Sequence, residues 1–187
     1  MPINSVCIFC GSASGSSDIY RRSVEALIRS IAKAGLSIVY GGGSTGLMGV
    51  VADTAIAEGV HIVGVTTRGL VARELVSSQL NALSITDSIA DRKSQMIEQA
   101  GAFIALPGGV GTLDELFEVM TLTQLGLQNK GFALLNVSGY FDPLLNYLEY
   151  MRREGFIHYD FHQFLIVDED PEVLLQKLQG FSLNSSK

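Results

Sequence analysis

The sequence has few residues with which to hold a metal ion. It contains two cysteines and three histidines among 187 residues. Cys7 and Cys10 form a CxxC, but they fall in a predicted strand, where residues three apart face opposite sides, whereas redox CxxC motifs open a helix. Zinc would need further ligands, and no Glu follows His158 to complete an HExxH motif with His162. We therefore expect neither a metal site nor a redox pair.

Long apolar runs and basic segments are also missing. No apolar run reaches the length of about 18 residues that a membrane span requires. The N-terminal stretch "MPINSVCIFC" has no basic segment before its apolar run, so a signal peptide is not expected. The net charge of −6 lacks the basic footprint of nucleic-acid binding. We expect a cytoplasmic protein that binds neither membranes nor nucleic acid.

Predicted strands and helices alternate along the whole chain. Strands are expected at 5–10, 36–40, 60–66, 82–87, 102–106, 131–137 and 164–168. Helices are expected at 18–35, from the loop 41–49 to Gly59, at 90–101, from Gly111 to about Leu125, and at 142–154 and 171–179, with 67–82 as loop and helical turns. Because the strands are apolar on both faces, residues 1–180 are predicted to form one α/β domain. This domain is a Rossmann-like, doubly wound parallel sheet with helices on both faces, and 181–187 form a flexible tail.

Glycines and charges gather where these strands end, which is where ligands of such sheets bind. Four corners, Gly11–Ser12, Gly41–Gly46, Asp91–Lys93 and Gly108–Glu115, are expected to converge on one crevice. The stretch "ALPGGVGTLDELFEV" places three glycines and two acids at one strand-to-helix corner. Glycines let an anion approach a helix N-terminus, but the acids would repel it. This favours a ligand with both a phosphate and a centre that becomes positive during reaction.

The loop 41–46 contains GxGxxG. A dinucleotide site would need an acid at the end of the next strand, which ends "GVTTRG", and a P-loop would need a Lys after the last glycine. A small phosphate-bearing ligand remains, and a tight helix–sheet packing turn is the structural alternative.

The helix after the PGG loop has apolar residues on two faces. The core face predicted from the i, i+3, i+4, i+7 spacing comprises Leu113, Leu116, Phe117 and Met120. Glu115 lies roughly opposite, and Val119 and Leu122 lie off the core face. We therefore expect a homodimer that covers the second face, with Glu115 at its edge. The alternative for Glu115 is a solvated acid that suits the helix dipole.

Arg92 and Lys93 begin the helix after the fourth strand, where the helix dipole disfavours positive charge. The pair indicates an anionic ligand or acidic partner residues, and a solvated pair is the alternative.

The segments "CGSASG", "VYGGGSTGLMG", "DRKSQM" and "ALPGGVGTLDELFEVMTLTQLG" occur in this order. With its PGGxGTxxE motif from Pro107 to Glu115 and the preceding Arg92–Lys93 pair, the stretch 5–160 resembles the LONELY GUY (LOG) family. These are the cytokinin riboside 5′-monophosphate phosphoribohydrolases, often labelled lysine decarboxylases. The resemblance implies hydrolysis of AMP-like nucleotides, N6-modified ones favoured, to free base and ribose 5-phosphate without a cofactor.

The same resemblance implies that Arg92 and Glu115 are the catalytic pair. The implied nucleotide contacts are Glu74, Arg92, Lys93, Gly109, Val110, Gly111, Thr112, Leu113, Asp114, Glu115 and Thr121, to which the glycine corners add Gly11, Ser12, Gly43 and Ser44. The family usually has MHxRK and TWxQLG, where this chain has Ile89–Ala90 and Leu122. These departures concern the base contacts and the subunit interface.

The chemistry of each group fits these roles. Glycosidic cleavage passes through an oxocarbenium-like sugar, which a carboxylate at Glu115 would stabilise. Arginine is a poor proton donor, so Arg92 is expected to fix the phosphate or ribose and to keep Glu115 ionised. Backbone N–H groups of 109–112 would cradle the phosphate.

Two rival functions remain, of which the first uses the same Rossmann-like scaffold. One is a non-catalytic carrier of a nucleotide or cofactor, like the molybdenum cofactor carriers, against which the Arg92–Glu115 pair argues. The other is lysine decarboxylation with pyridoxal phosphate. Four lysines precede the terminal one, none in a recognisable context for that cofactor: Lys33, Lys93, Lys130 and Lys177.

Overall fold

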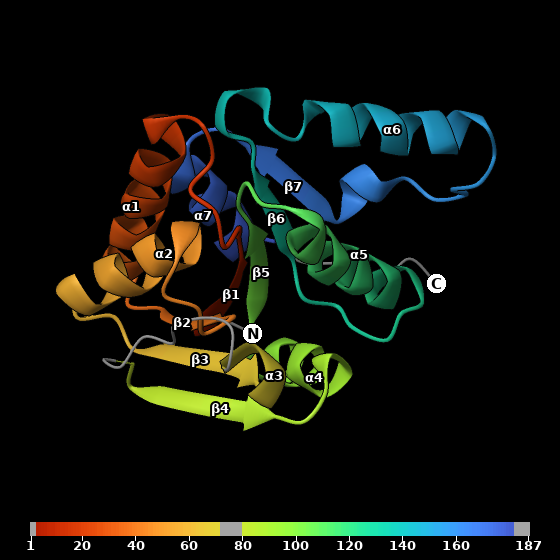
Figure 1. Cartoon of the computed structure of the whole chain (residues 1–187). Helices are drawn as coiled ribbons and strands as arrows, with labels where there is room; N and C mark the ends of the chain where they lie inside the picture. Colours follow the sequence, from red (N-terminus) through yellow and green to blue (C-terminus); the bar gives the residue numbers. More distant parts are fainter. Residues whose placement is uncertain (1–2, 72–79, 182–187) are drawn as a thin grey trace.

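The protein is described by a computed structural model over residues 3–71 and 80–181. Within these residues seven strands form one sheet, all paired in parallel, in the order β4-β3-β2-β1-β5-β6-β7 (Figure 1). The strands are β1 (Ser5–Phe9), β2 (Ser37–Tyr40), β3 (Ile62–Thr67), β4 (Ala82–Thr86), β5 (Ala102–Ala105), β6 (Phe132–Leu135) and β7 (Leu165–Asp168). The helices are α1 (Asp18–Lys33), α2 (Gly46–Ala57), α3 (Arg68–Val71), α4 (Ile89–Gln99), α5 (Val110–Gln124), α6 (Asp142–Arg153) and α7 (Pro171–Gln179), with short 3-10 turns η1 (Val137–Gly139) and η2 (Phe161–Gln163).

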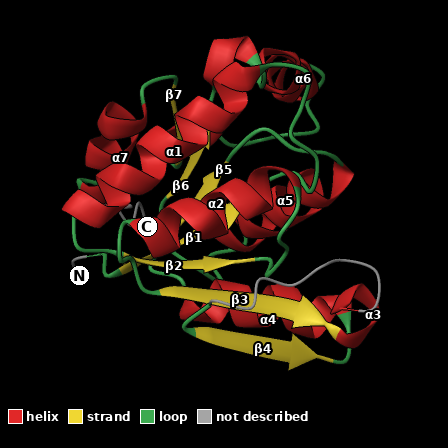
Figure 2. Ribbon diagram, turned by 60° about the vertical axis from the view of Figure 1, so that its left-hand side comes forward, coloured by secondary structure: helices red, strands yellow, loops and turns green. Residues whose placement is uncertain are grey.

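Helices cover both faces of the sheet (Figure 2). Helices α1, α2 and α7 pack on one face, and α4, α5 and α6 pack on the other. Strand β1 and Cys10, the residue after it, supply both layers, because Ile8 and Cys10 belong to the first cluster while Cys7 and Phe9 belong to the second. The two thiols are therefore free and lie on opposite faces, as the strand reading of the CxxC predicted.

The predicted fold class is confirmed. Each expected strand and each helix of regular length is present close to its expected bounds. The expected loop at 67–82 begins with the one-turn helix α3. The rest of that loop from 72 to 79 lies outside the described residues, and so does 182–187 of the expected tail. None of the described helices has both the length and the apolar character needed to cross a membrane.

The topology places one opening beside β1. The chain runs from β1 outward through β2 and β3 to β4, and then returns to β5 on the other side of β1. Ile8 pairs with Tyr40 of β2 and Phe9 with Ala105 of β5 at this point of reversal. The loops that follow β1 and β5 lie side by side here, with the Gly11 N–H donating to the Pro107 carbonyl at 3.1 Å. A doubly wound sheet offers its binding crevice at such a point of reversal.

Helix α5 packs with a different face from the one that its spacing predicts. Its buried residues are Thr112, Glu115, Leu116, Val119, Met120 and Thr123. Val119 is 0% exposed, so its assignment to an uncovered face was wrong, while Phe117 is 36% exposed instead of lying in the core. Apolar residues surround most of this helix, so periodicity alone does not fix its orientation. Leu116, Val119 and Met120 of this stripe pack in the core cluster on this face of the sheet, and Glu115 at its edge meets Arg92 of α4.

This orientation predicts unequal costs for two truncations on α5. Val119→Ala removes two buried methyl groups and leaves a cavity, which should lower the free energy of unfolding by about 2 kcal/mol. Phe117→Ala removes a larger but partly solvated ring and should cost less than Val119→Ala. Urea unfolding of both variants checks this, and the reverse ranking would contradict the observed packing.

Candidate active site

A cavity of about 360 Å³ opens at the carboxyl ends of the central strands. Its wall contains residues that sequence reasoning singled out: Gly11, Ser12, Arg92, the run 109–112, Asp114 and Glu115. Three of the four expected corners are thus brought together at the point where the strand order reverses. The fourth, the glycine loop after β2, contributes its first residue, Gly41.

Arg92 projects from the first turn of α4 into this wall and has two partners. Its Nε donates to the carbonyl of Val65 at 2.9 Å, and its Nη1 donates to Oε1 of Glu115 at 2.8 Å. A Cβ on Gly41 would lie 2.4 Å from Nη2, so only glycine leaves room for this guanidinium. The first glycine of the GxGxxG loop therefore serves the arginine.

Glu115 and Arg92 form an ion pair that is largely removed from water. Their side chains are 10% and 11% exposed. Burial raises the pKa of the Glu115 carboxyl, the Arg92 guanidinium opposes this, and the balance lies above the usual glutamate value. The site therefore holds a carboxylate whose ionised form depends on its arginine.

The N-terminus of α5 faces the cavity. Gly109 is the N-cap residue and has no side chain with which to cap the helix. The first helical hydrogen bond runs from the Leu113 N–H to the Gly109 carbonyl at 3.2 Å. The N–H groups of 110–112 precede that bond, as in every helix start, and can bind an anion. Gly108 has a different task, since a Cβ there would lie 2.7 Å from the backbone nitrogen of Gly11.

The N-terminus of α2 is used differently. The N–H groups of Leu47 and Met48 donate to the carbonyls of Ala13 and Gly11 at 3.4 and 3.2 Å. Gly43 and Ser44, expected to bind substrate, are outside the set of described residues that lines the cavity. The tight packing turn, which was the structural alternative for this loop, explains these contacts.

Lys93 turns to the acids of α5 instead of the cavity. Its Nζ lies 2.9 Å from Asp114 Oδ2 and 2.6 Å from Glu118 Oε2. The sequence left three interpretations of the Arg92–Lys93 pair: an anionic ligand, acidic partner residues or a solvated pair. The structure gives both cations acidic partners, Glu115 for Arg92 and Asp114 and Glu118 for Lys93.

Three other expected contacts are not placed in the cavity wall. Leu113 packs beside the core cluster under α5. Thr121 is exposed and donates to the Phe117 carbonyl at 2.8 Å. Glu74 lies outside the described residues.

Three apolar residues of the wall were not predicted from the sequence to belong to the site. Met48, Leu70 and Ile89 line the cavity beside Val110. Ile89 drew notice only as a departure from a family pattern, and Met48 and Leu70 resemble ordinary helix residues. They become wall residues because α2, α3 and α4 all begin at this edge of the sheet.

The buried ion pair predicts a non-additive effect on stability. Arg92→Met leaves Glu115 buried without its counter-charge, which should lower the free energy of unfolding by about 3–5 kcal/mol. Combining Arg92→Met with Glu115→Leu should recover most of that loss, because both charges are then gone. Urea unfolding checks this, and a double variant no more stable than Arg92→Met would contradict it.

Comparisons with known proteins identify the family of this chain. A family model described as "Possible lysine decarboxylase" matches residues 48–178. "Probable cytokinin riboside 5′-monophosphate phosphoribohydrolase LOGL2" of Oryza sativa is 38% identical over 97% of this chain and 75% of its own length. "Cytokinin riboside 5′-monophosphate phosphoribohydrolase LOG4" of Arabidopsis thaliana is 38% identical over 95% of this chain and 82% of its own.

Solved structures extend the likeness of fold. A molybdenum cofactor binding protein from Rippkaea orientalis superposes with a TM-score of 0.70 over 96% of this chain and 98% of its own, at 18% identity. The molybdenum cofactor carrier protein of Chlamydomonas reinhardtii gives a TM-score of 0.70 at 16% identity, over 95% of this chain and 98% of its own. At these identities the likeness concerns the fold alone. The family model and the plant relatives both cover most of the chain, which therefore belongs to the LOG family of phosphoribohydrolase-like proteins.

Proposed function

We propose that this protein hydrolyses the N-glycosidic bond of AMP-like nucleoside 5′-monophosphates, releasing the free base and ribose 5-phosphate. The observation that carries the proposal is the buried Arg92–Glu115 pair in a cavity wall beside an uncapped helix N-terminus. The names of the plant relatives give the same reaction and point to N6-modified adenine as the base.

The helix start supplies the phosphate end of this site. The backbone N–H groups of 109–112 suit a phosphate, and Ser12 lies in the same wall. Glycine at 109 and 111 leaves the backbone open, since a Cβ at either position would meet nothing within 4 Å. A phosphate placed here puts the ribose near Glu115, the sixth residue of the helix that begins at Val110.

Glu115 acts on the sugar. When the bond between C1′ and the base nitrogen breaks, its electrons leave with the base and positive charge develops on the ribose. A carboxylate beside C1′ stabilises that charge and accepts a proton from the attacking water. Arg92 donates to Oε1, and Oε2 is the oxygen that would accept the water proton. The departing base takes up a proton. Overall, one water is consumed: its hydroxyl is added to C1′ and a proton to the base nitrogen.

The apolar wall suits the base. Met48, Leu70, Ile89 and Val110 provide surface for a planar ring and for a substituent on it.

The lysines do not support the rival reaction, the lysine decarboxylation named by the family description. Lys93 pairs with two acids, and Lys130 Nζ donates to the Ile97 carbonyl at 2.7 Å. The proposed reaction needs no cofactor, and the free thiols of Cys7 and Cys10 suit the cytoplasm.

The test compares AMP with adenosine and removes the carboxylate. Parent protein should cleave AMP far better than adenosine, since only AMP uses the helix start. Glu115→Gln should lower turnover by at least ~10²-fold and change nucleotide affinity much less, because the ground-state sugar is neutral. In the parent, kcat/KM should rise with pH as Glu115 ionises, with a midpoint above the ordinary glutamate value because burial raises its pKa.

Glu118→Gln is the matched control. Glu118 lies one turn further along α5 and also pairs with a cation from α4, so the substitution is chemically the same. It should keep most activity and the acid limb of the pH profile. Parent protein that binds AMP without cleaving it would favour the carrier alternative, and near-parent turnover in Glu115→Gln would remove Glu115 from the reaction.

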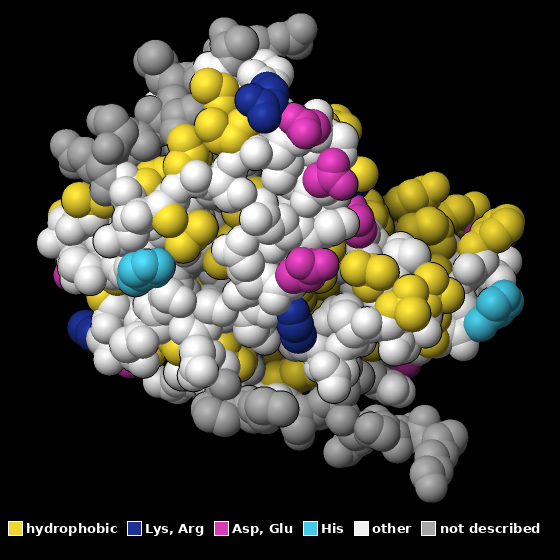
Figure 3. Space-filling model, turned by 90° about the horizontal axis from the view of Figure 1, so that it is seen from below, with side chains coloured by type: hydrophobic (Ala, Val, Ile, Leu, Met, Phe, Trp, Pro, Cys, Tyr) yellow, Lys and Arg dark blue, Asp and Glu magenta, His cyan; other side chains and the backbone are white. Residues whose placement is uncertain are grey.

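We also propose a homodimer built around the end of α5. Although Val119 no longer supports it, other apolar side chains just beyond this end are uncovered: Leu125 and Leu127 are 61% and 70% exposed. Figure 3 shows hydrophobic side chains gathered on the side of the molecule where α5 and α6 end in Figure 1. An apolar surface of this kind is typical of an interface.

Light scattering should therefore give twice the mass of one chain at micromolar concentration. Leu125→Asp puts a charge in the proposed interface and should shift the protein toward the monomer. Val173→Asp, at a position 39% exposed on α7 of the other face, should leave the mass unchanged. A monomeric parent would contradict the proposal.

A further inference from the structure

We propose that Tyr140 is a positioning residue that fixes the peptide between Gly108 and Gly109 and so aims the Gly109 N–H into the phosphate site. The inference rests on the proposed function, because it concerns how the proposed phosphate cradle is held. It is carried by one contact between segments far apart in the sequence: the Tyr140 hydroxyl donates to the Gly108 carbonyl at 2.5 Å.

The direction of this bond decides where the next N–H points. In a trans peptide the C=O and the following N–H point to opposite sides, and no cis peptide occurs in the described residues. Tyr140 and Gly108 line a second, smaller hollow together with Tyr20, while Gly109 lines both this hollow and the main cavity. With its carbonyl held toward Tyr140, the peptide turns the Gly109 N–H away from Tyr140, toward the main cavity.

The peptide needs such a restraint. Gly109 has no side chain, and a Cβ there would meet nothing within 4 Å, so no side-chain packing at position 109 opposes rotation of this peptide. If the peptide turned over, the Gly108 carbonyl would face the phosphate and an attractive contact would become a repulsive one. A hydrogen bond on the carbonyl opposes that rotation without occupying the site.

The turn that presents Tyr140 is itself costly to form. Ser138 has φ 51°, the only non-glycine residue with positive φ in the described chain, and Gly139 follows at φ 71°. The Asn136 side chain closes this turn, accepting from the Phe141 N–H and donating to Asp142 Oδ1, both at 2.7 Å. Non-glycine residues persist in this conformation where the surroundings determine it, and such positions cluster near functional sites.

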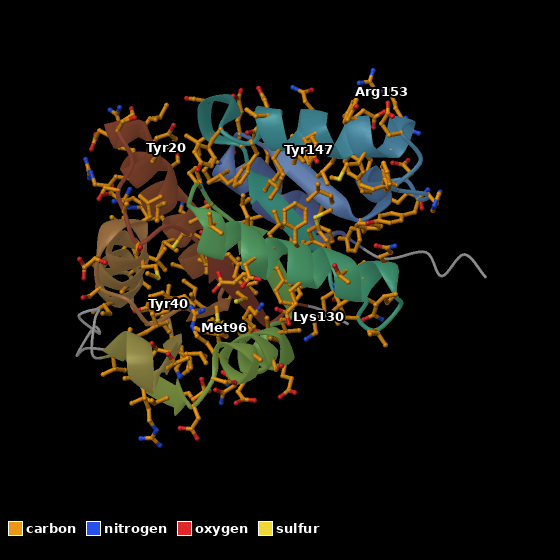
Figure 4. All side chains as sticks on the ribbon, turned by 45° about the vertical axis from the view of Figure 1, so that its right-hand side comes forward. Tyr20, Tyr40, Met96, Lys130, Tyr147 and Arg153 are labelled. Atoms are coloured by element: carbon orange, nitrogen blue, oxygen red, sulfur yellow. The ribbon has the colours of Figure 1, made fainter. Side chains whose placement is uncertain are left out.

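Aromatic packing fixes the ring. Tyr140 makes edge contacts with Phe141 at 5.0 Å and with Tyr20 at 5.8 Å between ring centroids. Figure 4 shows Tyr20 at the end of α1 that faces the start of α6. The ring is thus held from two sides, and its hydroxyl has a defined place. Removing that hydroxyl should leave the ring packing intact.

The experiment compares Tyr140→Phe with Tyr20→Phe, which removes a hydroxyl from the same wall. Two competitive inhibitors of AMP cleavage separate the roles: ribose 5-phosphate, which carries the phosphate, and adenosine, which lacks it. In Tyr140→Phe the inhibition constant of ribose 5-phosphate and the KM of AMP should rise about five- to tenfold, the usual worth of one hydrogen bond. The inhibition constant of adenosine and the thermal unfolding midpoint should stay at parent values.

The outcomes separate this inference from the proposed function. If parent protein cleaves AMP and Tyr140→Phe behaves like Tyr20→Phe toward ribose 5-phosphate, Tyr140 has no positioning role. Equal weakening of adenosine and ribose 5-phosphate would also overturn it, since the effect would then be a general loosening of the site. Parent protein that neither cleaves AMP nor binds ribose 5-phosphate would overturn the proposed function and this inference together.

Discussion

Two opposite charges held out of water between α4 and α5 set the arrangement of the rest of the site. The Arg92 guanidinium is fixed by the Val65 carbonyl and by Glu115, and each of the surrounding segments is adapted to it. The loop after β2 has glycine at 41 to make room, and α5 is rotated so that an acid lies on its buried side. A hydrophobic pair of similar volume often stabilises a fold as well or better, so stability alone does not explain these buried charges.

The sheet makes this arrangement possible because its strand order reverses beside β1. Loops that follow β1 and β5 meet there with the starts of α2, α4 and α5. The N-termini of α2 and α5 have different partners. The start of α2 is bonded to the carbonyls of Gly11 and Ala13 and ties the loop after β1 in place. The start of α5 is without a side-chain cap and faces the cavity. One glycine-rich corner therefore supports the structure, and the other is open to a ligand.

Much of this was predictable from the sequence, and the failures have physical causes. Alternating apolar runs and glycine-marked strand ends predicted the fold, the crevice and the presence of Arg92 and Glu115 in its wall. The buried face of α5 was mispredicted because apolar residues surround the helix. Val119 was expected off the core face and is buried, whereas Phe117 was expected in the core and is 36% exposed. The partners of Lys93 depend on how α4 and α5 pack. Tyr140 had no signal at all, since a single tyrosine after a turn gives no indication that its hydroxyl reaches the Gly108 carbonyl.

The cavity wall is built from two kinds of material, and this bears on how such a protein changes over evolutionary time. Under the proposed function the phosphate would contact peptide groups at the start of α5, which most substitutions leave in place. The base would contact the side chains of Met48, Leu70, Ile89 and Val110, any of which one nucleotide change can alter. Selectivity for the base can therefore change by substitution while the binding of the phosphate is kept. A lineage built on this scaffold is thus free to diversify in what it accepts without first losing what it does.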